Sequence, residues 1–206
     1  MDIGVLTGLL EEKGWQINQQ CKDHHLFEHK SRPQLTSFIL PSSPSETVPA
    51  GTFNAIMRVA HARKETRHWT LFIREVKEVN LILEKQADSL WGRIELPGLI
   101  VSTHGHTADC VATSLRSLLI EFALDNALSA CSAIMALPFL YVYDTTAVWT
   151  LVKQVKASHI AELIGVDIDL VGQYMTGSTY PGPEIAGRLE DSIHELGRQL
   201  LQISIR

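Results

Sequence analysis

The first 64 residues carry helical and strand patterns of apolar positions. A helical stripe near the amino terminus ends at Gly14, and polar residues then alternate with apolar ones over 15–18, as in a strand. Two more strands are predicted at 25–28 and 35–40, and Thr52 is placed to cap a second helix. The predicted order is helix–strand–strand–strand–helix. The two helical stripes comprise Val5, Leu6, Leu9 and Leu10, and Phe53, Ile56, Met57 and Ala60.

A second α+β pattern occupies residues 78–143, after a charged and aromatic connector at 65–77. Alternating apolar residues predict strands near 79–83, 90–96 and 99–103, and another strand at 139–143. Thr107 is placed to cap a helix between the last two strands. The order β-β-β-α-β suits a small domain with one helix on its sheet. The apolar stripe of that helix comprises Val111, Leu115, Leu118, Leu119 and Phe122.

The remaining residues, 144–206, are predicted to be entirely helical. A small residue, Ala161, allows two helices to approach closely, and Gly165 turns the chain between them. Val166 and Val171 are placed to fill the angle between these helices. This spacing is typical of a helix-turn-helix, whose second helix presents its outer face to the DNA major groove. An ordinary helical hairpin is the alternative.

Composition limits what these segments can do. Hydrophobic residues make up 45% of the chain and charged residues 20%, so a packed core is expected. The net charge is −5 and the sequence pI is about 6.0. Non-specific affinity for nucleic acid comes mainly from Lys and Arg on phosphates. Binding of nucleic acid must therefore be local and geometric, or be achieved by a dimer.

Cysteine usage and hydropathy favour a cytoplasmic protein without a membrane partner. The three cysteines are far apart in sequence and form no Cys-x-x-Cys motif, which fits a reducing compartment. The amino terminus has no signal-peptide pattern, and the longest apolar stretch, 127–142, is too short to span a bilayer. His104 and His106 could bind a metal, but an exposed turn is the favoured interpretation. We therefore expect no metal and no cofactor.

Three short motifs of the first segment resemble those of HicA toxins. Residues 12–15 (EKGW), 23–27 (DHHLF) and 48–52 (VPAGT) stand where that family has its GW, GSHHxF and lPxGT motifs. The resemblance implies a fold like that of a double-stranded-RNA-binding domain (dsRBD) for residues 1–64. It also implies the activity of that family, which consists of metal-independent endonucleases of mRNA.

The other two segments resemble HicB antitoxins. Residues 83–85 (LEK) and 90–96 (LWGRIEL) are similar to the HicB sheet domain, a degenerate RNase H-like fold. The stretches 157–181 and 193–200 (IHELGRQL) look like the Cro/CI-type helix-turn-helix domain appended to such antitoxins. Together, the motifs follow the order toxin, antitoxin, DNA-binding domain.

The resemblance implies that His24, the first histidine of the 23–27 motif, is the catalytic residue. An imidazole that titrates near neutral pH can serve as base or acid in RNA cleavage; a structural histidine is the alternative. Two departures from the family pattern count against strong activity: Lys22 and Asp23 replace Gly-Ser, and the uncharged residues 41–44 (PSSP) replace a basic stretch. The predicted RNA-binding residues are Lys22, His25, Arg58 and Lys64.

The predicted DNA contacts lie in the third segment. Gln173, on the outer face of the second helix of the motif, can bind adenine in a bidentate manner. Asp167 and Asp169 would oppose phosphate, and their favoured role is to cap a helix amino terminus. The remaining candidates are phosphate contacts from Lys156, Ser158, Ser178 and Thr179.

Two functions follow from these expectations. In the first, the chain is a fused toxin–antitoxin protein: the HicB-like domain neutralises the RNA-cleaving HicA-like domain in cis, and the helix-turn-helix binds operator DNA for autorepression. In the alternative, the chain is a HicB-type antitoxin and transcriptional regulator with a catalytically dead HicA-like domain. Both predict a homodimer or higher homo-oligomer on an inverted repeat of operator DNA, and mRNA is the possible substrate.

Overall fold

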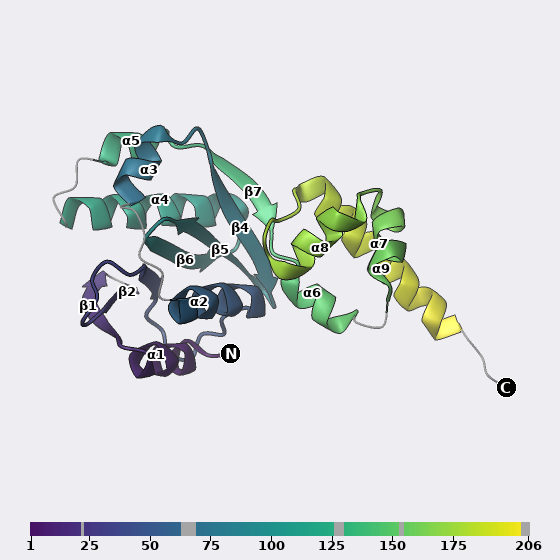
Figure 1. Ribbon diagram of the computed structural model, residues 1–206, viewed down its shortest axis with the longest axis horizontal. Helices are drawn as coiled ribbons and strands as arrows, with labels where there is room; N and C mark the ends of the chain where they lie inside the picture. Colours follow the sequence, from purple (N-terminus) through teal and green to yellow (C-terminus); the bar gives the residue numbers. More distant parts are fainter. Residues whose placement is uncertain (22, 63–68, 126–129, 153–154, 203–206) are drawn as a thin grey trace. The chain divides into compact units, whose positions relative to one another are not determined.

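The computed structural model of the chain (Figure 1) describes residues 1–21, 23–62, 69–125, 130–152 and 155–202. These residues divide into two units, Met1–Leu140 and Tyr141–Arg206. Within the described ranges, none of the helices combines the length and the apolar character needed to cross a bilayer.

A seven-stranded mixed sheet organises the structure. Its strand order is β1-β2-β3-β6-β5-β4-β7. Strands β1 to β3 form an antiparallel meander, as do β4 to β6, and the two meanders join where β3 pairs in parallel with β6. The strands are β1 (Trp15–Cys21), β2 (His24–His29), β3 (Ser37–Pro41), β4 (Val79–Gln86), β5 (Ser89–Leu96), β6 (Leu99–Gly105) and β7 (Phe139–Tyr143).

The α+β class predicted from the sequence is confirmed, but the boundary between the first two segments is not a boundary between compact units. Residues 1–64 and 78–140 belong to one unit because Phe38 of β3 pairs with Ile100 of β6. Both side chains lie in one core cluster, together with Trp91 of β5. Periodicity shows that a strand has a buried face, but it does not show which strand lies beside it. The connector predicted at 65–77 also contains a helix, α3 (Trp69–Glu75).

Helices cover both faces of this sheet (Figure 1). On one face, α1 (Ile3–Glu12) and α2 (Ala50–Ala62) pack over Phe27, Phe38 and Leu40. On the other face lies α4 (Ala108–Asp125), with α3 and α5 (Cys131–Ala136). Trp69 of α3 stacks on Phe122 of α4 with ring centroids 5.7 Å apart. The apolar stripe predicted for α4 is buried. The long helix on this face of the sheet therefore comes from the second segment.

Gly92 of β5 marks the closest approach of α4 to the sheet. A Cβ atom at this position would lie 2.3 Å from Cγ1 of Val111 and 3.2 Å from Cδ1 of Leu81. Glycine is therefore required here by space rather than by backbone angles. Gly92 also pairs with Thr103 of β6, so the helix is held close to that part of β6.

The described residues of the second unit form four helices. They are α6 (Thr146–Leu151), α7 (Ala157–Ile164), α8 (Ile168–Thr176) and α9 (Pro183–Gln202). Gly165 ends α7 with a φ of 71°, in the left-handed region that favours glycine. Asp167 caps α8 by accepting a hydrogen bond from the Asp169 amide at 2.7 Å, which confirms its predicted capping role. The core of this unit consists of Trp149, Ile160, Ala161, Ile164, Val171, Tyr174 and Leu189.

We predict that Gly92→Ala lowers the free energy of unfolding of the full chain by about 1–3 kcal/mol, because the added methyl group overlaps Val111. The double variant Gly92→Ala/Val111→Ala should be more stable than the sum of the single variants implies, since it removes the overlap. Urea unfolding measures both effects. As a control, Gly8→Ala in α1 meets no atom within 4 Å, so it should not destabilise the chain. Additive losses at Gly92 and Val111 would contradict the prediction.

Candidate functional site

His24, the predicted catalytic residue, is the first residue of β2, and its neighbours include residues of β3 and β6. Its strand partner is Pro41 of β3, and its Nε2 atom is 3.1 Å from the hydroxyl of Thr103 on β6. Thr103 follows Val101 by two residues, and Val101 pairs with Ile39. The parallel pairing of β3 with β6 therefore brings His24 into contact with a residue 79 positions away.

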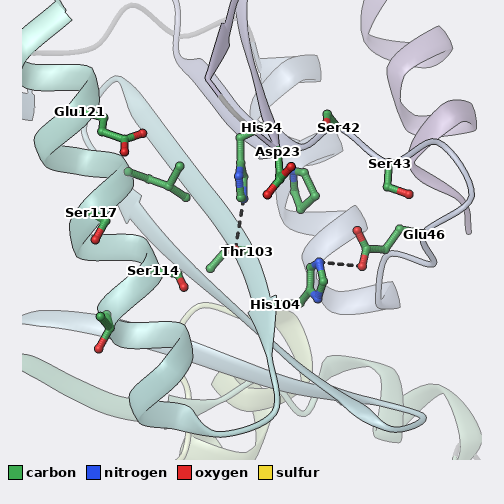
Figure 2. A pocket seen from close by; sticks show the side chains of 13 residues that line it. Asp23, His24, Ser42, Ser43, Glu46, Thr103, His104, Ser114, Ser117 and Glu121 are labelled. Carbon is green, nitrogen blue, oxygen red and sulfur yellow. Dashed lines mark hydrogen bonds and ion pairs between the residues drawn. The ribbon is translucent and has the colours of Figure 1, made fainter.

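The side chain of His24 opens into a cavity of about 540 Å³ between the sheet and α4 (Figure 2). Ser114, Ser117 and Glu121 line it from α4, on the side opposite the loop that follows β3. The walls are rich in hydroxyl groups. The full lining is Asp23, His24, Pro41, Ser42, Ser43, Glu46, Thr103, His104, Thr113, Ser114, Ser117, Leu118 and Glu121.

The cavity carries more acidic than basic groups. Among its lining residues, as far as the structure describes them, there are three carboxylates and two imidazoles, and no Lys or Arg. Glu46 binds His104, with Oε1 and Nε2 2.6 Å apart, and the ring of His104 lies against Trp91. Asp23 and Glu121 are the other two carboxylates. An RNA phosphate placed beside His24 would face these negative charges.

Burial sets the protonation state of His24. Desolvation lowers its pKa from 6.5 to about 4, with help from the nearby imidazoles of His104 and His25. The carboxylates of Asp23 and Glu121 oppose this shift but do not overcome it. At neutral pH the imidazole is therefore uncharged and holds one proton. In this state it is a weak base, and it lacks the second proton that an acid catalyst would deliver.

Of the other predicted RNA-binding residues, the structure describes His25 and Arg58, and neither lines this cavity. His25 lies on the opposite face of β2 from His24, where its ring is 6.3 Å from that of Phe27. Arg58 is exposed on α2, 3.7 Å from Glu95. Lys22 and Lys64 lie outside the described residues.

Several residues of the cavity gave no signal in the sequence. Thr103, Ser114, Ser117 and Glu121 belong to the second segment, so no local motif connects them with His24. The strand period does place Thr103 and Val101 on one face of β6, and the helical period places Ser114, Ser117 and Glu121 on one face of α4. Only the pairing of β3 with β6 brings these two faces to His24.

The predicted DNA-binding residues lie on or near α7 and α8. Lys156 occupies the position before α7 and is exposed, as is Ser158 in its first turn. Gln173 is exposed on α8, between the buried residues Val171 and Tyr174. Beyond α8, Ser178 is exposed and Thr179 is half-buried; the Ser178 hydroxyl is 2.8 Å from that of Thr176.

Comparison of the chain with models of known protein families, with curated protein sequences and with solved structures finds no match. The resemblance to HicA and HicB thus rests on the motifs alone. Among the described residues, no three His, Cys, Asp or Glu side chains are grouped as ligands of a metal ion.

We predict that His24 makes the stability of the chain depend on pH between 6.5 and 4. The unfolded chain takes up a proton at His24 more readily than the folded chain does, so stability is complete above pH 6.5 and falls as pH drops toward 4. A full shift from 6.5 to 4 would be worth about 3.4 kcal/mol, at about 1.36 kcal/mol per unit. Because the side chain is only partly buried, solvent screening reduces the expected loss to about 2 kcal/mol.

The measurement is urea unfolding at pH 7 and pH 4.5 for the wild-type chain and His24→Gln, which does not titrate. The wild type should lose more stability than His24→Gln over this interval. The matched control is His194→Gln, which replaces an exposed histidine of α9 and should behave as the wild type. Equal losses in the wild type and His24→Gln would show that His24 is not held uncharged.

Proposed function

We propose that the chain is a toxin–antitoxin protein of HicA/HicB type in one polypeptide. Its first segment is an RNA-cleaving fold with His24 as the catalytic residue, and its second segment keeps that residue inactive. The helix-turn-helix of the second unit binds operator DNA for autorepression, and the protein acts as a homo-oligomer in the cytoplasm.

One observation carries the proposal of inhibition in cis. The Nε2 atom of His24 lies 3.1 Å from the Thr103 hydroxyl, and α4 lies over the same face of the sheet. Both belong to the HicB-like segment. A base or acid catalyst must come within about 2.6–3.2 Å of the atom that gives or takes its proton, either directly or through one water molecule. Thr103 occupies one such position, so the second segment competes with the ribose of a substrate.

The proposal of DNA binding is supported by the exposed face of α8. Asp169, Gly172 and Gln173 are exposed there, while Val171 and Tyr174 face the core, as in a helix that enters a groove. The carboxylates of Asp167 and Asp169 beside this face weaken phosphate contacts. Specific binding then depends on base contacts and on two copies of the unit acting together, and it should be measured at low salt.

The surroundings of His24 favour a second candidate function, that of a regulator whose first segment no longer cleaves RNA. Asp23, Glu46 and Glu121 make the cavity acidic, and the pKa of His24 is lowered to about 4 by burial. Both features disfavour catalysis at neutral pH: the carboxylates repel an RNA phosphate, and the uncharged imidazole is poorly suited to the proton transfers of strand cleavage. In this function the second segment and the helix-turn-helix act as in the first proposal, and the first segment serves only as part of the sheet.

Expression of residues 1–64 and 65–206 from separate promoters tests the first function against the second. We predict that residues 1–64 alone arrest growth and cleave cellular mRNA, because the cover from β6 and α4 is missing. His24→Ala should abolish the arrest. Co-expression of residues 65–206 should restore growth, since the second segment then binds the first in trans. RNA sequencing of cleavage ends measures the activity directly.

The control is the amount of tagged 1–64 protein, which must be equal for the wild type and His24→Ala. His25→Ala serves as a matched variant, because His25 faces away from the cavity and its loss should leave the arrest intact. Normal growth and intact mRNA at equal protein amounts would reject the toxin and support the regulator.

Gel-shift titration of the full chain on its own upstream DNA tests the DNA-binding function. We predict that Gln173→Ala weakens specific binding by about 1–3 kcal/mol, because a bidentate base contact is lost. Lys156→Ala should weaken binding to all sequences alike and reduce the salt slope by about one. Gln199→Ala, on an exposed position of α9, is the control and should bind as the wild type. Unchanged binding by Gln173→Ala would remove α8 as the reading helix.

A further inference from the structure

A buried carboxylate of the second segment binds the amino terminus of a helix of the first. Oε1 of Glu84, on β4, accepts a hydrogen bond from the Gly51 amide at 2.8 Å. Its Oε2 atom accepts bonds from the amide and the hydroxyl of Thr52, at 2.8 and 3.1 Å. Thr52, which the sequence suggested as the cap of this helix, instead lies in the first turn of α2 and donates to Glu84. The cap therefore comes from a strand 32 residues further along the chain.

A buried arginine completes this arrangement. The side chain of Arg93, on β5, is fully buried, and its NH1 atom lies 3.3 Å from the Thr52 hydroxyl. Its Nε atom donates to Glu95 at 2.8 Å. Two backbone amides and one hydroxyl thus donate to the carboxylate of Glu84, a residue that is 7% exposed, and the Arg93 guanidinium contacts the same hydroxyl. Such a set of donors at the positive end of a helix is the chemistry by which proteins bind carboxylates and phosphates.

We propose that the amino terminus of α2, Thr52 and Arg93 form an oxyanion-binding site, and that Glu84 is its built-in occupant. The donors on α2 lie within the 48–52 motif (VPAGT) of the first segment, whereas the anion that fills them comes from the second. Occupation of the site thus fastens the two segments together. This last point rests on the proposed function, in which the second segment restrains the first.

Physical chemistry distinguishes this site from an ordinary helix cap. A capping side chain usually belongs to the residue just before the helix and satisfies one amide. Here both carboxylate oxygens are used, and the anion is buried beside a buried cation. Removal of the carboxylate leaves the two buried amides of Gly51 and Thr52 without their acceptor, which is costly. A small free anion of matching shape should therefore be able to take the vacated position.

The test is chemical rescue of Glu84→Ala in the full chain. This substitution removes the CH₂–COO⁻ group, so acetate has the shape and charge of what is missing. We expect a lower melting temperature than that of the wild type, and acetate should raise it by about 4 °C once its concentration reaches about ten times its Kd. Acetamide has nearly the same shape without the charge, and it should give no rise. Sodium chloride at matched ionic strength should give none either.

Two variants control for general effects of acetate. Glu84→Gln keeps the volume of the side chain but accepts through one oxygen only, so it should be destabilised and not be rescued. Leu83→Ala removes a buried side chain of the same strand without opening the site, and acetate should not restore it. If Glu84→Ala does not fold, its refolding yield is compared in acetate and in acetamide. A rise or yield that is the same with acetate and acetamide overturns the proposal.

RNA cleavage by the same variant separates this inference from the proposed function. Acetate-dependent stability of Glu84→Ala supports the anion site, whether or not the variant cleaves RNA. Cleavage by Glu84→Ala without any effect of acetate supports the toxin and rejects the site. Phosphate provides one further comparison: rescue by acetate but not by phosphate would limit the site to carboxylates.

Discussion

The parallel pairing of β3 with β6 is the constraint on which the rest of the first unit depends. It joins two antiparallel meanders, each of which is a local structure, into one sheet. With this pairing, β6 with its covering helix α4 lies beside β3, and Phe38 and Leu40 of β3 share one core with residues of α1, α2, β5 and β6. Without it, the first segment would expose one face of its sheet and an unpaired edge strand.

The same pairing decides what His24 can do. It places Thr103 within hydrogen-bonding distance of the imidazole and α4 over the cavity, and the burial that results lowers the pKa of His24. A residue whose motif suggests catalysis is thereby held uncharged among carboxylates. The capping of α2 by Glu84 is a further contact between the two segments, on the other side of the sheet from α4. The second segment therefore sets the surroundings and the protonation state of His24, and it also caps α2 of the first segment.

Local patterns predicted much of the secondary structure but not the way in which the segments combine. Sequence patterns predict the helical stripe of α4, the turn at Gly165 and the cap at Asp167, because each depends on residues close in sequence. They do not predict that the strands form a single sheet, because β3 and β6, the pair that joins it, are separated in sequence by two strands and two helices. For the same reason, His24 was found as a candidate, whereas Thr103, Glu121 and the anion Glu84 were not.

The order of the segments has a consequence during synthesis. Residue 64 leaves the ribosome well before residue 125, the last of α4, and the 61 residues between them (125 − 64) take about 3–12 s at ordinary elongation rates. Throughout that interval, a nascent chain presents its histidine face before the covering helix exists. A ribosome that stalls or a message that breaks within this region would release a fragment that has no cover. Whether translation continues through α4 therefore decides whether the cavity at His24 acquires its covering helix.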